Sequence, residues 1–421
     1  MNPPKTSSST TPLWTRDYAV WFGADTSGAL VMGMQMIAAP LVLFEVTGST
    51  ATAGVITALT GVVSLVLTVP AGVLLDRWPR RRVIVVTALA QAVIFAGGVG
   101  LYLTGHLVMT VLALILMLLT AVGTLAGPAT NAALRQVVGV DNLPRAMSLN
   151  QGRDAFIQLA SGPTAGLLFT LAPWLPWLVN TVASVLKSTS ASFLSDPMVP
   201  PGTAARTPFW KDLGTGASFL LKNRMLLVLT IAASLINFAG TGVMQGLFLG
   251  LQLSAQTAHL VGWTATGIAI GSLLGASLSA VLVKRVGTGI LLAAGFAWEA
   301  AAIVSIALAP PGILTVMLVG VIFVAIPAIN AGSLGLIMAI SPAELQGRVV
   351  TTISMLSMAM TPLASLAAGV GLAHLTPSIL YLAFAAVSLL PALMVLVSAP
   401  LRAIPASGAW EEHLSHLTVR T

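Results

Sequence analysis

The chain has 421 residues, of which 57% are hydrophobic and only 7% are charged, with a formal net charge of +7. A soluble domain carries roughly 25% charged residues, so the composition excludes an ordinary soluble protein, and the absence of cysteine excludes disulfides and thiolate metal sites. In lipid every backbone N–H and C=O must be satisfied within the protein, which leaves helices or closed barrels. The apolar runs continue for ~20 residues, the length of a spanning helix, whereas barrel strands alternate over about 10 residues. We therefore expect an all-α membrane protein.

The chain begins with a polar segment, residues 1–16, in which Pro, Ser and Thr occupy the place of a signal-peptide apolar region. We interpret it as a disordered cytoplasmic tail. Apolar runs separated by Pro, Gly and charged residues then predict twelve transmembrane helices. Their approximate ranges are 18–44, 52–75, 83–104, 108–134, 146–171, 174–196, 225–250, 257–283, 287–309, 312–340, 348–373 and 377–399.

These helices are predicted to form two pseudo-symmetric six-helix bundles, residues 17–196 and 225–400, joined by a cytoplasmic linker at 197–224. Within the linker, Phe209–Lys222 is predicted to form an amphipathic helix at the membrane interface. A short basic connection follows an apolar, Gly-containing run in both bundles, which is typical of the parallel repeats of transporters. Residues 401–421 are predicted to be a second cytoplasmic tail.

The basic residues fix the expected orientation. If the N-terminus is inside, all connections on the cytoplasmic side carry Lys or Arg, and the connections on the opposite side carry none. We therefore expect both termini in the cytoplasm and interpret the net positive charge as a topogenic signal beside anionic membrane lipid. Because the charges are scattered over short loops, nucleic-acid binding is not expected. The connections without Lys or Arg are near 45–51, 105–107, 172–173, 251–256, 310–311 and 374–376.

Enzyme motifs are absent from the sequence. There is no H-E-x-x-H, no G-x-S-x-G and no phosphate-binding G-x4-G-K-[ST]. The five His lie in predicted outer loops or in the C-terminal tail, which argues against an intramembrane metal site. We expect neither enzymatic activity, nor a cofactor, nor a bound metal.

Several segments together resemble the major facilitator superfamily. Residues 72–82 (GVLLDRWPRRR) are close to its signature between spans two and three, and 161–166 (SGPTAG) resemble its antiporter motif in span five. Residues 344–349 (ELQGRV) lie before span eleven. With 44–49 (FEVTGS) and 142–150 (NLPRAMSLN), the pattern is most similar to the branch that holds macrolide and siderophore exporters.

This resemblance implies secondary active transport by alternating access in a bacterial inner membrane, with a monomer exporting amphipathic drug-like, antibiotic or siderophore-like molecules in exchange for protons. Three departures bear on it: Pro79 and Leu167 replace motif glycines, and span four has only Arg135, at its end, where many proton-coupled exporters carry an embedded Arg. Two alternatives remain. One is a proton-independent lipid or lysophospholipid translocator, and the other is a non-transporting membrane receptor.

Ionisable residues inside predicted spans are costly in lipid and are functional candidates by default. Asp25 in span one and Arg153 and Asp154 in span five lie at similar depths. Because adjacent residues on a helix do not face each other, we expect Arg153 to pair with Asp25. Burial and a neighbouring cation act in opposite directions on the protonation of a carboxyl, so a pair that breaks during transport is a candidate for proton coupling, with Asp154 as a second titratable group. The alternative is a static pair near the cytoplasmic interface.

Three other charged residues have simpler expected roles. Glu299, in the middle of span nine, is expected to be neutral and packed against a neighbour. Lys187 in span six is expected to extend its ammonium group to the cytoplasmic surface. Glu45 is expected at the outer membrane interface.

The resemblance also implies a conformational latch in the motif that begins at Gly72. Asp76 would face the positive N-terminal end of span eleven, with counter-charges from Arg77, Arg80 and Arg81. The alternative is that these charges only direct membrane insertion.

The antiporter-like motif of span five needs no charge. Pro163 removes a helical hydrogen bond and kinks the span, and Gly162 and Gly166 form a small-residue face for close helix packing. We consider both a seal between the two bundles and ordinary helix packing.

In this superfamily spans one, four, seven and ten line the substrate cavity. Their polar and soft residues suit a bulky amphipathic molecule, because Met adapts to irregular apolar surfaces; the alternative for each is ordinary packing. The cavity candidates are Gln35, Met36, Asn131, Asn237, Gln245 and Asn330.

Overall fold

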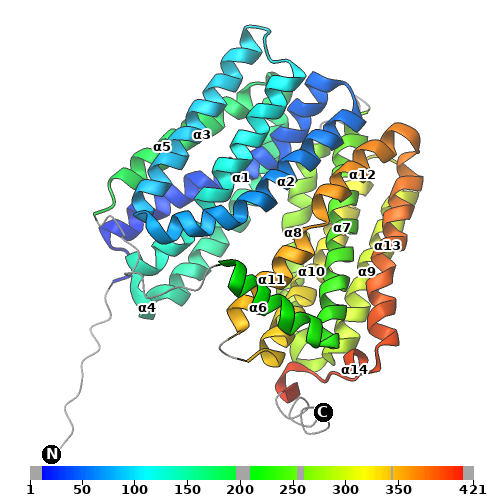
Figure 1. Cartoon of the computed structure of the whole chain (residues 1–421). Coiled ribbons are helices and arrows are strands. Elements are labelled where there is room, and N and C mark those ends of the chain that lie inside the picture. The colour runs from blue at the N-terminus through cyan, green and yellow to red at the C-terminus, as the bar shows by residue number, and fades with distance from the viewer. Residues whose placement is uncertain (1–11, 196–208, 254–259, 343–344, 411–421) are drawn as a thin grey trace, which may run out of the picture.

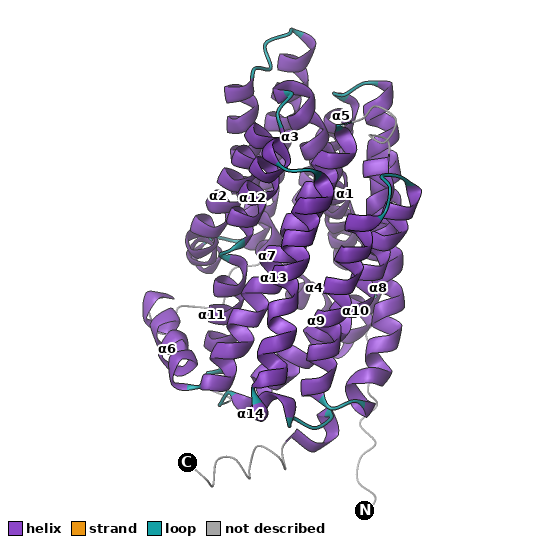
Figure 2. Cartoon of the chain, turned by 90° about the vertical axis from the view of Figure 1, so that its right-hand side faces the viewer, coloured by secondary structure: helices purple, strands orange, loops and turns teal. Residues whose placement is uncertain are grey.

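The structure is a computed structural model that describes residues 12–195, 209–253, 260–342 and 345–410. These residues form fourteen α-helices and one short 3-10 helix, and no strand occurs among them. Figure 2 shows helices along the whole described chain. The prediction of an all-α membrane protein is confirmed.

The first half of the chain forms a bundle of five helical elements. Gly48, in the left-handed conformation at φ 59°, ends the first of them, and the side chain of Ser49 caps the next by accepting a hydrogen bond from the Thr52 amide. The elements are α1 (Arg16–Thr47), α2 (Thr50–Arg77), α3 (Arg80–Leu103), α4 (Met109–Leu171) and α5 (Leu175–Ser192).

The second half begins with a 14-residue helix and continues with α-helices of 4 to 29 residues. Predicted span 348–373 is interrupted at Ala359 and Met360, just before Pro362, which starts a new helix without needing a backbone donor. The elements are α6 (Phe209–Lys222), α7 (Arg224–Gln252), α8 (Leu260–Arg285), α9 (Thr288–Leu308), α10 (Ile313–Ile340), α11 (Gln346–Met358), α12 (Thr361–His374), α13 (Pro377–Val397), α14 (Ala399–Arg402) and the 3-10 helix η1 (Ser407–Ala409).

Element α4 contains two predicted spans and the connection between them, which is helical instead of a loop. The chain nevertheless folds back within it. Trp21 Nε1 donates to the Thr130 carbonyl at 3.1 Å, and the Tyr18 hydroxyl lies 3.5 Å from Asn150 Oδ1. Tyr18 and Trp21 are stacked neighbours on α1, whereas residues 130 and 150 of a straight helix would lie ~30 Å apart. The two arms of α4 therefore cross the first bundle separately.

Ten helices of the described chain are long and apolar enough to span a membrane. The predicted spans 146–171 and 174–196 are not among them, because their helices are more polar. Four polar residues of α5 share one buried face with the spacing of a helical stripe. They are Asn180, Ser184, Lys187 and Ser188.

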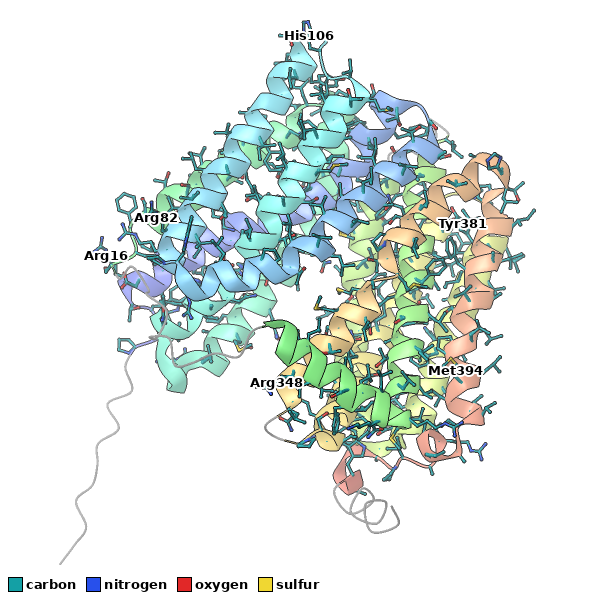
Figure 3. All side chains as sticks on the ribbon, viewed as in Figure 1. Arg16, Arg82, His106, Arg348, Tyr381 and Met394 are labelled. Atoms are coloured by element: carbon teal, nitrogen blue, oxygen red, sulfur yellow. The ribbon has the colours of Figure 1, made fainter. Side chains whose placement is uncertain are left out.

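The outer surface of the molecule carries large apolar side chains that are well exposed, among them Leu273, Leu308 and Val397. Such a surface is typical of lipid contact rather than water contact. Arg16, Arg82 and Arg348 lie toward the side of the molecule where the termini emerge, and His106 lies at the opposite end (Figure 3). We call these two ends the terminal side and the far side.

The two halves meet on the far side and diverge toward the terminal side (Figure 1). Near the start of α2, a Cβ on Gly54 would lie 2.7 Å from the Gly369 Cα of α12, so the two backbones touch. About two helical turns further along α2, a Cβ on Gly61 would lie 3.0 Å from Pro362 Cγ. Small residues therefore allow the halves to pack closely at this end.

The described part of the C-terminal segment packs against the second bundle on the terminal side. Leu401 and Ile404 are buried, and Trp410 Nε1 donates to the Thr288 hydroxyl at 2.9 Å. The rest of the predicted C-terminal tail, like the predicted N-terminal tail up to residue 11, lies outside the described residues.

Candidate transport site

Asp25 and Arg153 form an ion pair across the first bundle. Arg153 Nη2 lies 2.5 Å from Asp25 Oδ2, which joins α1 to the second arm of α4. Arg153 also bonds its neighbour in sequence, with 2.7 Å from Nη2 and 3.1 Å from Nε to Asp154 Oδ1. The expected pair of Arg153 with Asp25 is therefore present, and Arg153 bonds Asp154 as well because its long side chain curves back over its own helix.

The guanidinium of Arg153 is held on further sides. Its Nη1 donates to Thr26 Oγ1 at 3.3 Å. Its Cζ atom lies 4.8 Å from the centre of the Phe22 ring, within range of a cation–π contact. The side chain of Arg153 is 9% exposed, that of Asp25 22% and that of Asp154 53%. Exposure within the cluster thus increases from the buried guanidinium of Arg153 to the solvent-accessible carboxylate of Asp154.

Lys187 of α5 lies inside the same bundle. It is 7% exposed, so the expectation that it extends to the surface is wrong. A Cβ on Gly28 of α1 would lie 2.9 Å from its Nζ, which shows how closely the two helices pack there. Lys187 interacts electrostatically with Asp25, yet within the described chain no hydrogen bond or ion pair to its ammonium group is found.

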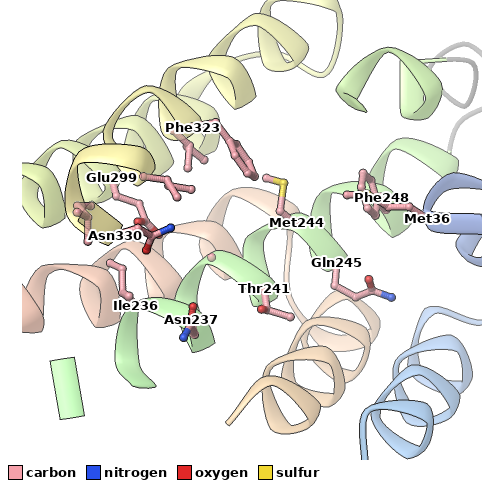
Figure 4. A pocket seen from close by; sticks show the side chains of 14 residues that line it. Met36, Ile236, Asn237, Thr241, Met244, Gln245, Phe248, Glu299, Phe323 and Asn330 are labelled. Carbon is pink, nitrogen blue, oxygen red and sulfur yellow. The ribbon is translucent and has the colours of Figure 1, made fainter. Parts of the chain in front are cut away.

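A cavity of about 430 Å³ lies mainly in the second half and reaches across to α1 (Figure 4). Its walls come from α1, α7, α9 and α10, and most of its side chains are apolar. The lining residues are Met36, Ile236, Asn237, Gly240, Thr241, Met244, Gln245, Phe248, Glu299, Ile322, Phe323, Ile326, Ile329 and Asn330.

Four of the six predicted cavity residues are among these: Met36, Asn237, Gln245 and Asn330. Two of their amides are engaged by the protein. Asn237 Nδ2 donates to the Ser357 carbonyl at 3.3 Å, and Gln245 Nε2 donates to Thr57 Oγ1 of the first half at 3.1 Å. The amide of Asn330 has no such bond within the described residues and is exposed in the cavity wall.

The other two predicted residues do not line this cavity. Gln35 Oε1 accepts a hydrogen bond from Asn180 Nδ2 of α5 at 3.4 Å and so faces the interior of the first bundle. Asn131 is exposed on the first arm of α4, beside Thr130, whose carbonyl binds Trp21.

Among the described residues that line the cavity, Glu299 is the only acidic or basic one. It comes from the middle of α9, is 3% exposed, and makes no hydrogen bond or ion pair within the described chain. Sequence reasoning treated it as a packed neutral residue. Its position in the middle of an apolar span was the available signal, but the sequence alone does not reveal that a cavity reaches it.

The antiporter-like motif lies at a contact between the halves. A Cβ on Gly162 would overlap the carbonyl oxygen of Gly262 in α8, and a Cβ on Gly262 would lie 3.3 Å from the Gly166 Cα. Pro163, between them, lies inside the continuous helix α4. This close backbone contact is the physical feature on which a seal between the halves would depend.

The predicted latch is described only in part. Gly72 and the side chains of Asp76 and Arg77 lie outside the described set, as does Glu344 before α11. Arg80 Nη1 donates to the Ala132 carbonyl at 3.0 Å, and Arg81 donates to the Ser192 carbonyl. Both arginines are therefore bonded within the first half, and the proposed contact with the second half stays a prediction.

Among the residues that the structure describes, no three His, Cys, Asp or Glu side chains gather as a metal site would require. The candidate functional groups are therefore the ion-paired cluster around Arg153, the lone carboxyl of Glu299 and the amphipathic cavity.

A family model described as Major Facilitator Superfamily matches residues 26–255, more than half of the chain. A comparison with curated protein sequences gave no match.

Solved structures of transporters share the fold at low sequence identity. A mutant form of the nucleoside transporter NupG superposes with a TM-score of 0.74 at 13% identity, covering 91% of this chain and 99% of its own. A bacterial homologue of the iron transporter ferroportin in an inward-facing state gives 0.70 at 14% identity, covering 94% and 98%. A bacterial homologue of the human lysosomal transporter Spinster, inward-facing and unoccupied, gives 0.65 at 12% identity, covering 95% and 98%. At such identities these likenesses concern the fold alone.

Proposed function

Because the chain belongs to the major facilitator superfamily, we propose that it is a secondary active transporter that exports amphipathic small molecules by alternating access in exchange for protons. The observation that carries this proposal is the amphipathic cavity of about 430 Å³ beside a junction of two halves that meet on one side only. Family membership supports transport rather than catalysis.

The arrangement of the halves supports alternating access. Backbone contacts between Gly54 and Gly369 and between Gly162 and Gly262 close the far side, while the helices diverge toward the terminal side. Among the predicted connections between spans, only those of the terminal side carry Arg and Lys, and by the positive-inside rule this side is cytoplasmic. We therefore infer an inner-membrane protein with cytoplasmic termini, captured in an inward-facing state that is suited to loading a substrate for export.

The cavity lining supports an amphipathic substrate. Its volume lies within the range of about 300–1,000 Å³ that is usual for small-molecule sites. Met36, Met244, Phe248 and Phe323 provide soft apolar contacts, and a few amides provide polar ones. An inorganic ion or a sugar would leave most of this apolar surface without a partner.

Proton coupling is assigned to the ion-paired cluster of the first half. Charges inside a membrane helix persist only where they are paired or used, and Arg153 holds two carboxylates whose exposures differ, 22% for Asp25 and 53% for Asp154. A change in the packing of α1 against α4 would alter the shielding of Asp25 from solvent. Such a change would let Asp25 bind and release a proton within the transport cycle.

Uptake into inverted membrane vesicles tests this function. In these vesicles the cytoplasmic face is outside, so export appears as uptake, and an acid interior provides the driving proton gradient. We expect uptake of amphipathic dyes several-fold above the level without a gradient, and loss of this stimulation in Asp25→Asn. Full proton-dependent uptake by that variant would remove Asp25 from the coupling mechanism. Gradient-independent movement of a lysophospholipid would favour a lipid translocator instead.

A further inference from the structure

The unpartnered carboxyl of Glu299 distinguishes the cavity from an ordinary apolar pocket. Its side chain is 3% exposed, lies in the cavity wall, and has neither a hydrogen bond nor an ion pair within the described chain. A carboxylate in apolar surroundings is stable only with a cation or a proton beside it. The described part of the chain supplies no cation at this place.

The helices packed around α9 confirm that this carboxyl stands apart from other charges. The titratable group on α13 is Tyr381, whose hydroxyl donates to the Gly246 carbonyl at 3.2 Å, and α10 has none. Arg224 of α7 and Arg402 of α14 lie at the terminal side of their helices, as do Lys284 and Arg285 in the last turn of α8. Glu299 is eleven residues from the start of α9, a distance of ~16 Å along the helix.

The space beside the carboxyl is kept open by a glycine. A Cβ on Gly240 of α7 would lie 3.3 Å from Glu299 Oε1, closer than ordinary van der Waals contact. Any larger residue at this position would crowd the oxygen from the cavity side. Asn330 and Met244, which line the same cavity, offer a free amide and a polarizable thioether to a ligand held there.

Building on the proposed transport function, we propose that Glu299 makes this cavity a binding site for cationic amphipathic molecules, with the carboxylate as the counter-ion of the substrate. The apolar wall binds the hydrophobic body and Glu299 binds the positive charge. When the cavity is empty the carboxyl holds a proton, and each cation that binds releases one proton to the solvent. Cation and proton therefore compete for the same group.

Equilibrium binding to the purified full-length protein in lipid nanodiscs tests the proposal. The probes are tetraphenylphosphonium, a permanent cation, and triphenylphosphine oxide, a neutral molecule of similar shape. We expect the wild type to bind the cation at least tenfold more tightly at neutral pH and this preference to weaken as the pH falls, because protons compete for Glu299. In Glu299→Gln the preference and its pH dependence should disappear, while the neutral probe binds as before.

Two further variants guard the interpretation. Glu45→Gln removes an exposed glutamate outside the cavity and should leave the preference unchanged. Gly240→Ala keeps the charge but crowds the carboxyl, and should lower affinity for the cation several-fold more than for the neutral probe. This variant decides the matter if Glu299→Gln does not fold, as judged by gel filtration.

The outcomes separate this proposal from the proposed function. Equal affinity of the wild type for the two probes, absence of measurable cation binding by the folded wild type, or a preference that survives Glu299→Gln would each overturn the assignment of Glu299, even if gradient-driven export is observed. Conversely, a preference that depends on Glu299 in a protein that moves no compound in vesicles would support this binding site and contradict the transport function.

Discussion

The two halves of the molecule handle buried charge in opposite ways. In the first half Arg153 holds Asp25 and Asp154 through direct hydrogen bonds of 2.5–3.1 Å and rests against Phe22. In the second half Glu299 is buried without a partner in the wall of a cavity. In the first half Arg153 satisfies the carboxylates of Asp25 and Asp154, whereas in the second half one carboxyl is left for something that the described chain does not provide.

This difference shows that burial alone does not identify a ligand site. Lys187 of the first half is, like Glu299, buried and without a hydrogen bond within the described chain, but it packs against α1 at Gly28 and does not line the cavity that Glu299 lines. Only where open volume reaches an unpartnered group does a ligand have access to it. We therefore expect paired charges to govern stability and conformational change, and the lone carboxyl to govern which molecules bind.

The largest effect is expected from breaking the paired cluster. Arg153→Ala removes the cation that is hydrogen-bonded to both Asp25 and Asp154, and loss of one partner from a buried ion pair costs about 3–5 kcal/mol. We expect a marked fall in the melting temperature of the purified protein and no gradient-driven uptake in vesicles.

Asp154→Asn is the matched control, since this side chain is 53% exposed and Arg153 keeps Asp25. It should lower the melting temperature far less than Arg153→Ala. Equal melting temperatures for the two variants would contradict the view that the first half depends on its internal pairing.

The second prediction concerns the contact between the halves. In Gly162→Ala the added Cβ would overlap the carbonyl oxygen of Gly262, and neither backbone moves aside cheaply. We expect at least a tenfold loss of uptake with little change in expression, because the halves can no longer close on the far side.

Gly152→Ala in the same helix is the control, since nothing lies within 4 Å of a Cβ there. It should transport like the wild type, because Ala is also the better helix former. If Gly162→Ala and Gly152→Ala transport equally well, the close approach of the halves has no role in the cycle.

Much of the fold could be predicted from the sequence, because apolar length and charge asymmetry are local signals. Ten predicted spans are helices that meet both the length and the hydropathy of membrane spans. The helical connection inside α4 and the buried polar face of α5 could not be predicted in this way. Both depend on contacts with α1, such as that between Asn180 and Gln35, which no local pattern encodes.

The candidate site was predictable to a smaller extent. The partnership of Asp25 and Arg153 follows from their depths in two spans, and four of six predicted cavity residues line the cavity. The direction in which Gln35 points and the access of the cavity to Glu299 depend on helix rotation and on small neighbours such as Gly240. Those are tertiary properties. They cannot be predicted from a sequence whose helices are apolar on all sides, because such helices have no polar face that would indicate their rotation.

The third prediction sharpens the comparison between Lys187 and Glu299. In Lys187→Met a buried, unbonded ammonium group is replaced by an apolar side chain of similar length. Because burying a charge without a hydrogen bond is unfavourable, we expect the melting temperature to rise by a few degrees, equivalent to about 1–2 kcal/mol. Uptake and the preference for cationic probes should stay within twofold of the wild type. Loss of uptake would mean that Lys187 belongs to the coupling cluster.

The smallest effect is expected at the hydrogen bond between the halves. Thr57→Val removes the hydroxyl that accepts the Gln245 amide at 3.1 Å, and a bond of this kind contributes about 1 kcal/mol. Since 1.4 kcal/mol is tenfold in an equilibrium, losing this far-side contact should raise the population closed on the terminal side roughly fivefold. Thr60→Val is the control, because among the described residues its hydroxyl bonds only the Thr57 carbonyl of its own helix.

The chain's lack of cysteine makes this shift measurable. Spin labels at Trp78→Cys and Leu221→Cys, both exposed, would report the separation of the halves on the terminal side. We expect the shorter distance to gain population in Thr57→Val and not in Thr60→Val. If the distribution of spin-label distances is the same in both variants, the halves are held together by backbone packing at the glycines alone. The Gln245 amide would then be available to bind a ligand in the cavity.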